Sequence, residues 1–352
     1  MNFRDLVSGR RRGLAAGLAR TGLGLLEFPY AIAIHWRNRR FDRPASFERV
    51  HVPVISVGNL TVGGTGKTPM VQWLATWFRR QGVRVALVSR GYGAEEGSRN
   101  DEALQLEQAL PDVPHVQDAN RVAASQMAIE EFQSQLIVLD DGFQHRRLHR
   151  DLDIVLLDAL DPFGHSHLLP RGLLREPVAS LRRAHIVALS RVDMISAEER
   201  ARIRDVAVRY APDAAWVETV HRPRRLLAAD GSSRELDAFN GQTVAAFCGI
   251  GNPLAFEHTL RSCGYLIADV RHFPDHHAYD RQDVEGLADW AQSLSGVKGL
   301  VCTHKDLVKL GTATIGGVPL WALAIELEIV RGQDELEARL RTLLARIPSA
   351  DA

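Results

Sequence analysis

The sequence predicts an α/β protein with two α/β/α domains built on mostly parallel sheets. One apolar run, residues 52–57, is short and β-branched and leads directly into a glycine-rich loop. The segment 70–80 then carries apolar side chains at helical spacing, so a strand, a loop and a helix follow one another. Short apolar runs and helical segments keep alternating to the end of the chain, which is the pattern of parallel sheets covered by helices.

Chain length and composition bound the class of protein. The 352 residues suggest two domains at a typical size of ~150 residues each. A hydrophobic content of 45% fits a globular protein with sizeable cores. Because the formal net charge is zero, we expect no nucleic acid as a partner. The three cysteines form no Cys-x-x-Cys pair, so we expect a reducing compartment without disulfides or a zinc site.

The first predicted segment, residues 1–45, is basic and apolar. Residues 1–43 hold nine arginines against three carboxylates, and arginines flank an apolar, small-residue stretch at 11–35. Such a helical segment can lie in a membrane interface with its arginines near anionic headgroups. It can equally be a pair of helices packed on its own domain, and the residues alone leave both possibilities open. No apolar run reaches ~18 residues, so we expect no transmembrane helix.

The loop after the first strand has the composition of a phosphate-binding loop, which predicts a P-loop NTPase-like fold. Its glycines allow backbone N–H groups to close around phosphate oxygens. Lys67 would reach the β- and γ-phosphates of a nucleotide, and the Thr68 hydroxyl would bind Mg²⁺. The usual spacing places glycine at position 61, where this chain has threonine; the alternative is a glycine-rich turn without a ligand. The predicted nucleotide-binding residues of the loop are Thr61, Val62, Gly63, Gly64, Thr65, Gly66, Lys67 and Thr68.

Two acidic positions follow in the first domain. Asp101 opens a helix, where it is either the N-cap or the general base of a reaction. The apolar strand 136–139 ends in Asp140 and Asp141, which is the form of a Walker-B element that holds Mg²⁺. Many strands end in aspartate for reasons of turn geometry alone. The phosphate loop upstream favours the metal role.

Three further side chains are candidates for the same site. His145 follows the two carboxylates closely enough to reach the strand-end crevice, although a lone loop histidine is usually just solvated. The loop 169–177 lies between two further apolar strands and carries Arg175 and Glu176. An arginine there can clamp a phosphate, and the glutamate can contribute to a metal shell. The alternative is ordinary surface charge.

The composition changes at residues 221–240, which become polar and read as a hairpin or linker. The predicted domains are therefore an N-terminal segment at 1–45, a nucleotide-binding domain at 46–220 and a smaller α/β domain at 241–352. The strands expected in the smaller domain are 243–248, 266–270, 299–302 and 320–324, and the expected helices are 253–262, 280–294 and 333–346.

Seven stretches together resemble one family, the tetraacyldisaccharide 4′-kinases, or lipid A 4′-kinases. They are Gly-Asn-Leu-Thr-Val-Gly-Gly-Thr-Gly-Lys-Thr-Pro (58–69), Ser-Arg-Gly-Tyr-Gly (89–93), Asp-Glu (101–102), Asp-Asp-Gly-Phe-Gln-His (140–145), Leu-Arg-Glu-Pro (174–177), Phe-Pro-Asp-His-His (273–277) and Thr-His-Lys-Asp (303–306). They run through both predicted domains, so the resemblance covers nearly the whole chain. Threonine at position 61 is itself the form found in that family.

The resemblance implies a reaction and a role for each matched residue. The γ-phosphate of ATP would pass to the 4′-hydroxyl of a tetraacyldisaccharide 1-phosphate, a lipid A precursor, to form lipid IVA. Asp101 would be the base and His145 would support it. The remaining implied roles are ATP and Mg²⁺ binding by Lys67 and Thr68, metal binding by Asp140 and Asp141, and contact with the nucleotide and phosphates by Arg121, Arg175, Glu176 and His276.

The resemblance also implies a location and partners. The N-terminal segment would dock on the cytoplasmic face of the inner membrane, where the acylated disaccharide lipid resides, and we expect a monomer. The rival function is a nucleotide-driven GTPase or ATPase switch, or a metallochaperone-type protein, because residues 303–306 superficially match a guanine-specificity motif. A third possibility is a peripheral membrane module with a vestigial nucleotide site, against which the intact Lys67, Thr68 and Asp141 argue.

Overall fold

The computed structural model describes residues 3–43, 46–91, 101–275 and 277–348, without the side chains of residues 101 and 102. By its contacts the chain divides into unit 1 (Met1–Arg90, Val113–Val220 and Ile329–Ala352) and unit 2 (Gly91–Asp112 and His221–Glu328). These units are defined by contacts alone. The predicted domains at 1–45, 46–220 and 241–352 therefore stay a prediction.

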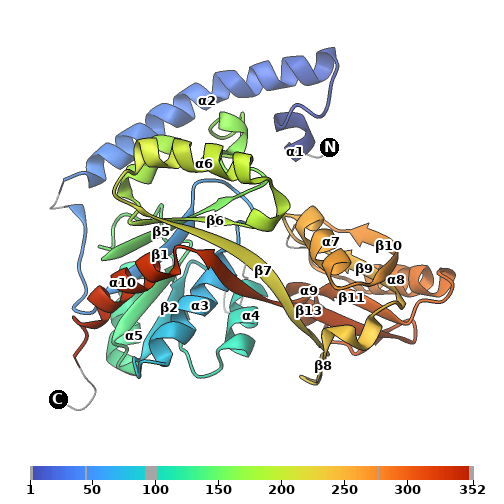
Figure 1. The fold of residues 1–352 in the computed structure, drawn as a ribbon. Coiled ribbons are helices and arrows are strands. Elements are labelled where there is room, and N and C mark those ends of the chain that lie inside the picture. Colours follow the sequence, from blue (N-terminus) through green and yellow to red (C-terminus); the bar gives the residue numbers. More distant parts are fainter. Residues whose placement is uncertain (1–2, 44–45, 92–100, 276, 349–352) are drawn as a thin grey trace. The chain divides into compact units, whose positions relative to one another are not determined.

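Unit 1 is built on a sheet with the strand order β7-β6-β5-β1-β4-β2-β3, in which every neighbouring pair is parallel (Figure 1). Its strands are β1 (Val54–Asn59), β2 (Val85–Ser89), β3 (His115–Gln117), β4 (Leu136–Asp140), β5 (Leu152–Asp158), β6 (Ile186–Ser190) and β7 (Ala215–Leu227). Strand β1 lies between β4 and β5. After β1 the chain forms β2, β3 and β4 on one side of it and then β5, β6 and β7 on the other. Such a switch point leaves a crevice at the carboxyl ends of the strands, where ligands bind.

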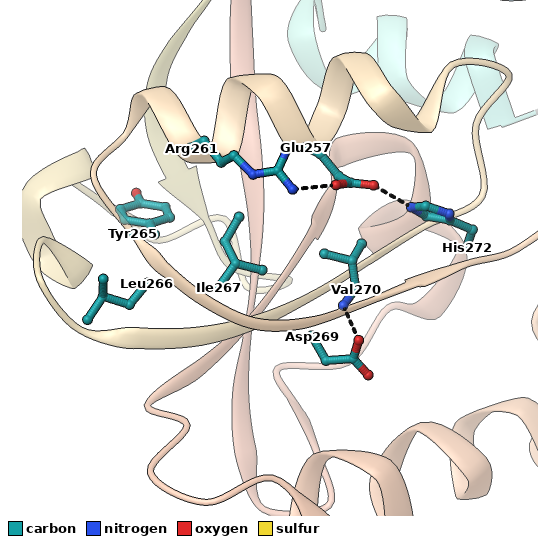
Figure 2. A pocket seen from close by; sticks show the side chains of 8 residues that line it. All are labelled: Glu257, Arg261, Tyr265, Leu266, Ile267, Asp269, Val270 and His272. Atoms are coloured by element: carbon teal, nitrogen blue, oxygen red, sulfur yellow. Dashed lines mark hydrogen bonds and ion pairs between the residues drawn. The ribbon is translucent and has the colours of Figure 1, made fainter.

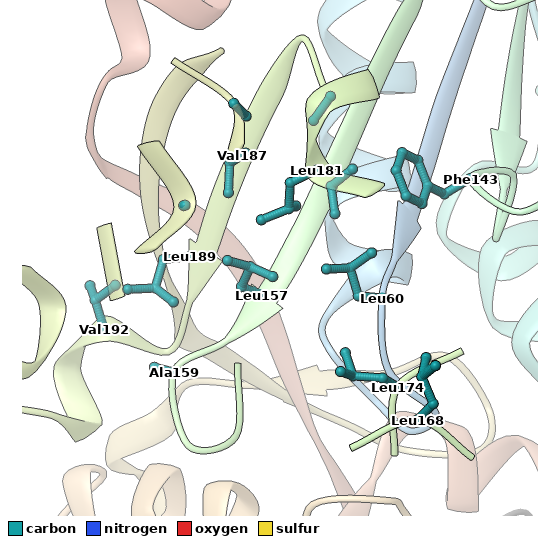
Figure 3. Close-up of a cluster of buried hydrophobic side chains, with 14 of the residues drawn as sticks. Leu60, Phe143, Leu157, Ala159, Leu168, Leu174, Leu181, Val187, Leu189 and Val192 are labelled. Atoms are coloured by element: carbon teal, nitrogen blue, oxygen red, sulfur yellow. The ribbon is translucent and has the colours of Figure 1, made fainter. Parts of the chain in front are cut away.

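Two apolar clusters lie along one face of this sheet, because residues that pair across neighbouring strands point to the same side. Leu157 on β5 and Leu189 on β6 belong to the cluster in Figure 3, with Leu60 and Phe143 from the loops at the strand ends. Leu139 on β4 belongs to the second cluster, and the register of β4, β1 and β5 places it on the same face as Leu157. The helices of the unit are α1 (Phe3–Val7), α2 (Leu14–Phe41), α3 (Lys67–Arg79), α5 (Arg121–Phe132), α6 (Ala197–Tyr210) and α10 (Gln333–Leu344), with short 3₁₀ turns η2 (Gly164–Ser166), η3 (Val178–Arg183) and η4 (Val192–Met194).

The predicted N-terminal helical segment is mostly one helix, α2, which continues through Pro29 for 28 residues and is drawn as the long blue helix of Figure 1. Part of it packs on the unit, since Ile34 is buried and Tyr30 contacts the cluster of Figure 3. The large apolar side chains that it exposes are Leu14, Leu18, Leu25, Leu26, Phe28, Ile32 and Trp36. None of the helices in the described part of the chain combines the length and apolarity needed to cross a membrane.

Unit 2 repeats the same architecture on a smaller scale, with the parallel order β10-β9-β11-β13. Its strands are β9 (Thr243–Cys248), β10 (Leu266–His272), β11 (Gly299–Thr303) and β13 (Val318–Arg331), with β8 (Ser233–Arg234) and β12 (Thr314–Ile315) as short antiparallel additions. Its helices are α4 (Asp101–Ala109), α7 (Pro253–Ser262), α8 (Arg281–Ser293) and α9 (His304–Leu310), with the turn η5 (Leu236–Phe239). Phe247 on β9 packs on one face of the sheet and its neighbour Cys248 on the other. The predicted polar hairpin is the turn between the end of β7 and β8.

Candidate functional site

The phosphate-loop sequence connects β1 to α3 in the predicted order. Gly66 has the left-handed backbone angle φ 90° at the N-cap of α3, and no side chain caps the helix. The first N–H groups of α3 are therefore left for an anion, which the helix N-terminus favours electrostatically. At the start of the loop Gly58 lies against the 142–145 segment, where a Cβ would be 2.5 Å from the Phe143 Cβ. Only glycine fits that approach.

Thr61 occupies a short antiparallel ladder rather than a bare turn. The N–H of Val62 donates to Leu173 O at 2.9 Å, and the N–H of Arg175 donates to Leu60 O at 2.7 Å, so residues 60–62 pair with 173–175. Thr61 is buried in this ladder, where its backbone is extended and needs no glycine. The same ladder brings Arg175 to the loop, which a standard glycine turn would not do.

Asp141 is the centre of the site. Its carboxylate accepts a hydrogen bond from Arg175 Nη1 at 2.7 Å, and its other oxygen lies 3.5 Å from Lys67 Nζ. Burial alone would raise the pKa of this carboxyl, but the charges and hydrogen bonds of the two cations outweigh it and lower the pKa to about 2. The residue has φ 54°, a left-handed conformation that is uncommon outside glycine and clusters at functional sites.

Arg121 and His145 belong to the same cluster. Burial and the charge of Arg90 lower the pKa of Arg121, while Asp141 and Asp140 oppose the shift, so the guanidinium lies close enough to feel both carboxylates. Burial and the nearby arginines, Arg121 first, lower the pKa of His145 to about 4. The imidazole is therefore neutral at pH 7.

Glu176 has a different environment from the one predicted for a metal ligand. Its side chain is completely buried, and its carboxylate accepts hydrogen bonds from Arg37, from Asn38 Nδ2 at 3.2 Å and from Arg183 Nη2 at 2.8 Å. Two of these partners come from α2, and Tyr30 of the same helix donates to Arg175 O at 3.0 Å. These contacts favour a positioning role, in which Glu176 holds the Arg175 segment against α2. Its metal role stays a prediction.

Two residues that contact the phosphate loop were given no role from the sequence: Ser190, the last residue of β6, and Arg191, which follows it. Ser190 Oγ donates to Thr65 O at 2.8 Å, and Arg191 Nη2 donates to Gly64 O at 2.9 Å. Arg191 also pairs with Asp158 at 2.8 Å and has φ 60°. These two hydrogen bonds fix the carbonyl groups of Gly64 and Thr65. We expect the N–H groups of the loop to be available to a phosphate. The signal in the sequence that could have indicated these contacts is a Ser-Arg pair at the end of a buried strand.

The chemistry of the site fits a nucleotide with Mg²⁺. The Thr68 hydroxyl in the first turn of α3 and the carboxylates of Asp140 and Asp141 at the end of β4 are oxygen ligands of the kind Mg²⁺ prefers. Thr65 Oγ1 and His145 Nε2 are buried and have no hydrogen-bond partner among the described residues, as expected where a polar ligand completes the site. Within the described ranges no group of three or more His, Cys, Asp and Glu residues is arranged to hold a metal by itself. Mg²⁺ sites often rely on phosphates and water instead.

Two predicted residues are not placed by this geometry. Asp101 is the first residue of α4, which belongs by its contacts to unit 2, where His304 Nε2 on α9 lies 3.0 Å from Gln108 Oε1. The phosphate loop belongs to unit 1. His276 lies outside the described residues.

The Thr-His-Lys-Asp segment of unit 2 does not present a guanine-reading carboxylate. Asp306 is completely buried and accepts hydrogen bonds from Gly249 N at 3.1 Å, Tyr279 Oη at 3.0 Å and Thr303 Oγ1 at 2.6 Å. Its oxygens thus hold the surrounding loops together. A separate surface cavity of about 510 Å³ lies along β10 and α7, where Glu257 bridges Arg261 and His272 (Figure 2). None of the predicted site residues lines it.

Comparisons with known proteins bear on the family of this chain. The model of the LpxK family, described as tetraacyldisaccharide-1-P 4′-kinase, matches residues 19–345. The chain is 40% identical over 362 residues to the tetraacyldisaccharide 4′-kinase of Anaeromyxobacter sp. (strain K), a match that covers 96% of this chain and 94% of the relative. It is 36% identical over 326 residues to that of Syntrophus aciditrophicus (strain SB), covering 85% and 87%.

A solved structure shares the fold over its full length. The crystal structure of LpxK from Aquifex aeolicus in complex with ATP matches with a TM-score of 0.73 at 29% sequence identity, covering 92% of this chain and 99% of that one. The resemblance inferred from the seven stretches is confirmed. Both the sequence matches and this structure show that the chain belongs to the LpxK family, the tetraacyldisaccharide-1-P 4′-kinases.

Proposed function

We propose that the chain transfers the γ-phosphate of ATP to the 4′-hydroxyl of a tetraacyldisaccharide 1-phosphate, which forms lipid IVA. Family membership across residues 19–345 is the main support and disfavours a nucleotide-driven switch. The observation in this chain that carries the proposal is Asp141, held between Lys67 and Arg175 beside an uncapped helix N-terminus.

The residues of unit 1 suit phosphoryl transfer, which asks mainly for positioning and neutralisation of charge. The backbone N–H groups at the start of α3 and the ammonium of Lys67 would hold the phosphates of ATP. Arg121 and Arg175 would place further positive charge around them. Mg²⁺, when bound through Thr68, Asp140 and Asp141, would supply additional neutralisation of the phosphate oxygens.

We assign the acid–base work to Asp101, with His145 in support. As the 4′-oxygen forms its bond to the γ-phosphorus, the bond from that phosphorus to ADP breaks and the hydroxyl proton passes to the Asp101 carboxylate. Asp101 belongs by its contacts to unit 2 and the phosphate loop to unit 1. His276 would contact the nucleotide.

We further propose that the protein works as a monomer at the cytoplasmic face of the inner membrane. Seven large apolar side chains are exposed along α2, which is more than a helix facing water needs. Arginines at both ends of the segment would lie near anionic headgroups. An acylated substrate that stays in the bilayer would then meet the site without leaving the membrane.

Incubation with γ-labelled ATP and the disaccharide 1-phosphate lipid in mixed micelles tests the proposal. The label is expected in the lipid, and removal of its phosphate by a phosphomonoesterase should release it again. GTP in place of ATP and a lipid already phosphorylated at the 4′ position are the controls. Nucleotide hydrolysis with no label in the lipid would favour the switch.

A further inference from the structure

The helix α1 brings an arginine to the phosphate loop. A Cβ built on Gly63 would collide with the guanidinium of Arg4, whose Cζ would be 3.5 Å away. Gly63 has φ 119°, so only glycine combines this backbone conformation with the approach of that side chain. The next residue, Gly64, has nothing within 4 Å of its own Cβ position. A cation thus lies at the middle of the loop, on a residue about 60 positions earlier in the chain.

The placement of Arg4 is fixed by packing rather than by a loose terminus. Leu6 and Val7 of the same helix are buried. Arg171 Nη1 donates to Val7 O at 3.2 Å, and Arg20 Nη1 donates to Arg11 O at 2.8 Å, which ties the turn after α1 to α2. All of these groups belong to unit 1, as does the phosphate loop.

The segment that holds α1 is the same one that pairs with the phosphate loop. Residues 167–175 are held by α2, since Glu27 accepts from Leu168 N at 2.7 Å, and they pair with the loop through Leu173 O and Val62 N. A short chain of contacts therefore runs from α1 and α2 to the residue before Gly63. These contacts fix the position of α1, which carries Arg4, relative to the phosphate loop.

Arg4 and Arg191 contact neighbouring loop residues but have different surroundings. Arg191 is buried, donates to Gly64 O and pairs with Asp158. Arg4 is half-buried, and its guanidinium borders Gly63. A guanidinium that borders a phosphate loop can form paired, charge-assisted hydrogen bonds to phosphate oxygens. Nucleotide-hydrolysing proteins use an arginine in this way to stabilise the charge of a transferring phosphoryl group.

We propose that Arg4 binds a phosphate group at the phosphate loop, as a residue of the active site supplied by the N-terminal segment. This rests on the proposed function, and it names a residue outside all of the matched stretches. Two phosphates have the required chemistry: the terminal phosphate of ATP and the 1-phosphate of the lipid. Because α1 is continuous with the segment that we expect to dock on the membrane, either contact would link lipid docking to the nucleotide site.

The test compares Arg4→Gln with Arg10→Gln in the full chain. Arg10 is exposed in the same segment, so both variants lose one positive charge from it. Binding of ATP and of ADP is measured by calorimetry without lipid, and turnover is measured with lipid that carries or lacks the 1-phosphate. A contact to the terminal phosphate predicts about ten- to a hundredfold weaker ATP binding or slower turnover in Arg4→Gln with ADP binding unchanged. A contact to the lipid predicts a raised KM only for the lipid with its 1-phosphate.

Arg4→Lys and the wild-type chain complete the experiment. Arg4→Lys keeps the positive charge and should recover part of the ATP binding or turnover that Arg4→Gln loses. A purely structural role would predict no such recovery, because lysine lacks the forked guanidinium of arginine. Thermal unfolding of Arg4→Gln should match that of Arg10→Gln. Two results would overturn the inference: Arg4→Gln equal to Arg10→Gln in every arm, or ATP bound more tightly because the guanidinium had obstructed the loop. If the wild-type chain itself transfers no label to the lipid, the proposed function fails instead.

Discussion

Asp141 and Arg175 form a 2.7 Å ion pair beside the phosphate loop, although 33 residues separate them in the chain. The pair exists because residues 173–175 run antiparallel to residues 60–62 and so deliver the guanidinium to the end of β4. Lys67 lies on the other side of the same carboxylate. Without that carboxylate, two cations would face each other across the loop.

Asp141→Asn should therefore impair catalysis more than folding. The amide cannot neutralise Lys67 and Arg175, and the loss of one charge-assisted contact, about 1.5–3 kcal/mol, corresponds to roughly 10- to 100-fold in kcat/KM. Steady-state transfer of label to the lipid measures it. Asp205→Asn on the exposed face of α6 is the matched control and should leave kcat/KM unchanged. A variant at position 141 that keeps wild-type kcat/KM would remove Asp141 from the site.

The local sequence pattern predicted the helices and strands well, because side-chain spacing and capping residues within each segment determine them. The helix 253–262 has the predicted bounds, since Asn252 caps it and the side-chain spacing of a helix does the rest. The strand-end carboxylates were predicted for the same reason. The parallel sheets, the order of strand, loop and helix, and the family all followed from such signals.

Contacts between distant segments could not be predicted. The explanation of Thr61 lies in a ladder with residues about 110 positions later, and Glu176 finds its partners on α2 about 140 positions earlier. Arg191 reaches Gly64 only because β6 ends beside the phosphate loop in the folded sheet. The grouping of α4 with α9 likewise depends on packing, and no local pattern in residues 101–109 records it.

His145 makes stability depend on pH in a definite direction. Its folded pKa is about 4, below the unfolded value near 6.5, so between these values the unfolded state binds more protons. The stability of the fold should consequently fall as the pH drops from about 6.5 to about 4. Asn at position 145 removes the titration, so the thermal midpoint of His145→Asn should fall less than that of wild type between pH 7 and pH 5. Identical slopes for His145→Asn and wild type would contradict the shift.

Glu176→Gln separates the positioning role from the metal role. The carboxylate is fully buried and neutralises Arg37 and Arg183, so removal of its charge should destabilise the fold by about 3–5 kcal/mol. Urea unfolding in the absence of Mg²⁺ measures this. Glu285→Gln breaks an exposed pair with Arg281 on α8 and should cost less than about 1 kcal/mol. Wild-type stability with a shifted Mg²⁺ requirement would instead make Glu176 a metal ligand.

Membrane docking through α2 predicts a graded loss when apolar side chains are replaced. Leu25 and Phe28 are 74% and 71% exposed, and each would contribute about 1.5–3 kcal/mol if fully buried in lipid. Leu25→Ser and Phe28→Ser should each weaken partition into vesicles of anionic and zwitterionic phospholipid by roughly tenfold or more. Leu254→Ser removes a side chain that is 53% exposed in unit 2 and is the control. Equal sedimentation of all the variants with vesicles would rule out α2 as the docking element.

Asp101→Asn distinguishes a base from a helix cap, because asparagine caps helices about as well as aspartate but cannot accept the proton. We expect turnover to fall by ~10²–10⁴ while ATP affinity, measured by calorimetry, stays within twofold of wild type. Asp334→Asn makes the same change in the first turn of α10, far along the chain from the matched stretches, and should leave turnover unchanged. If Asp101→Asn behaves like Asp334→Asn, the aspartate serves only the helix, and the base must come from elsewhere in the site, with His145 the next candidate because its imidazole is neutral at pH 7.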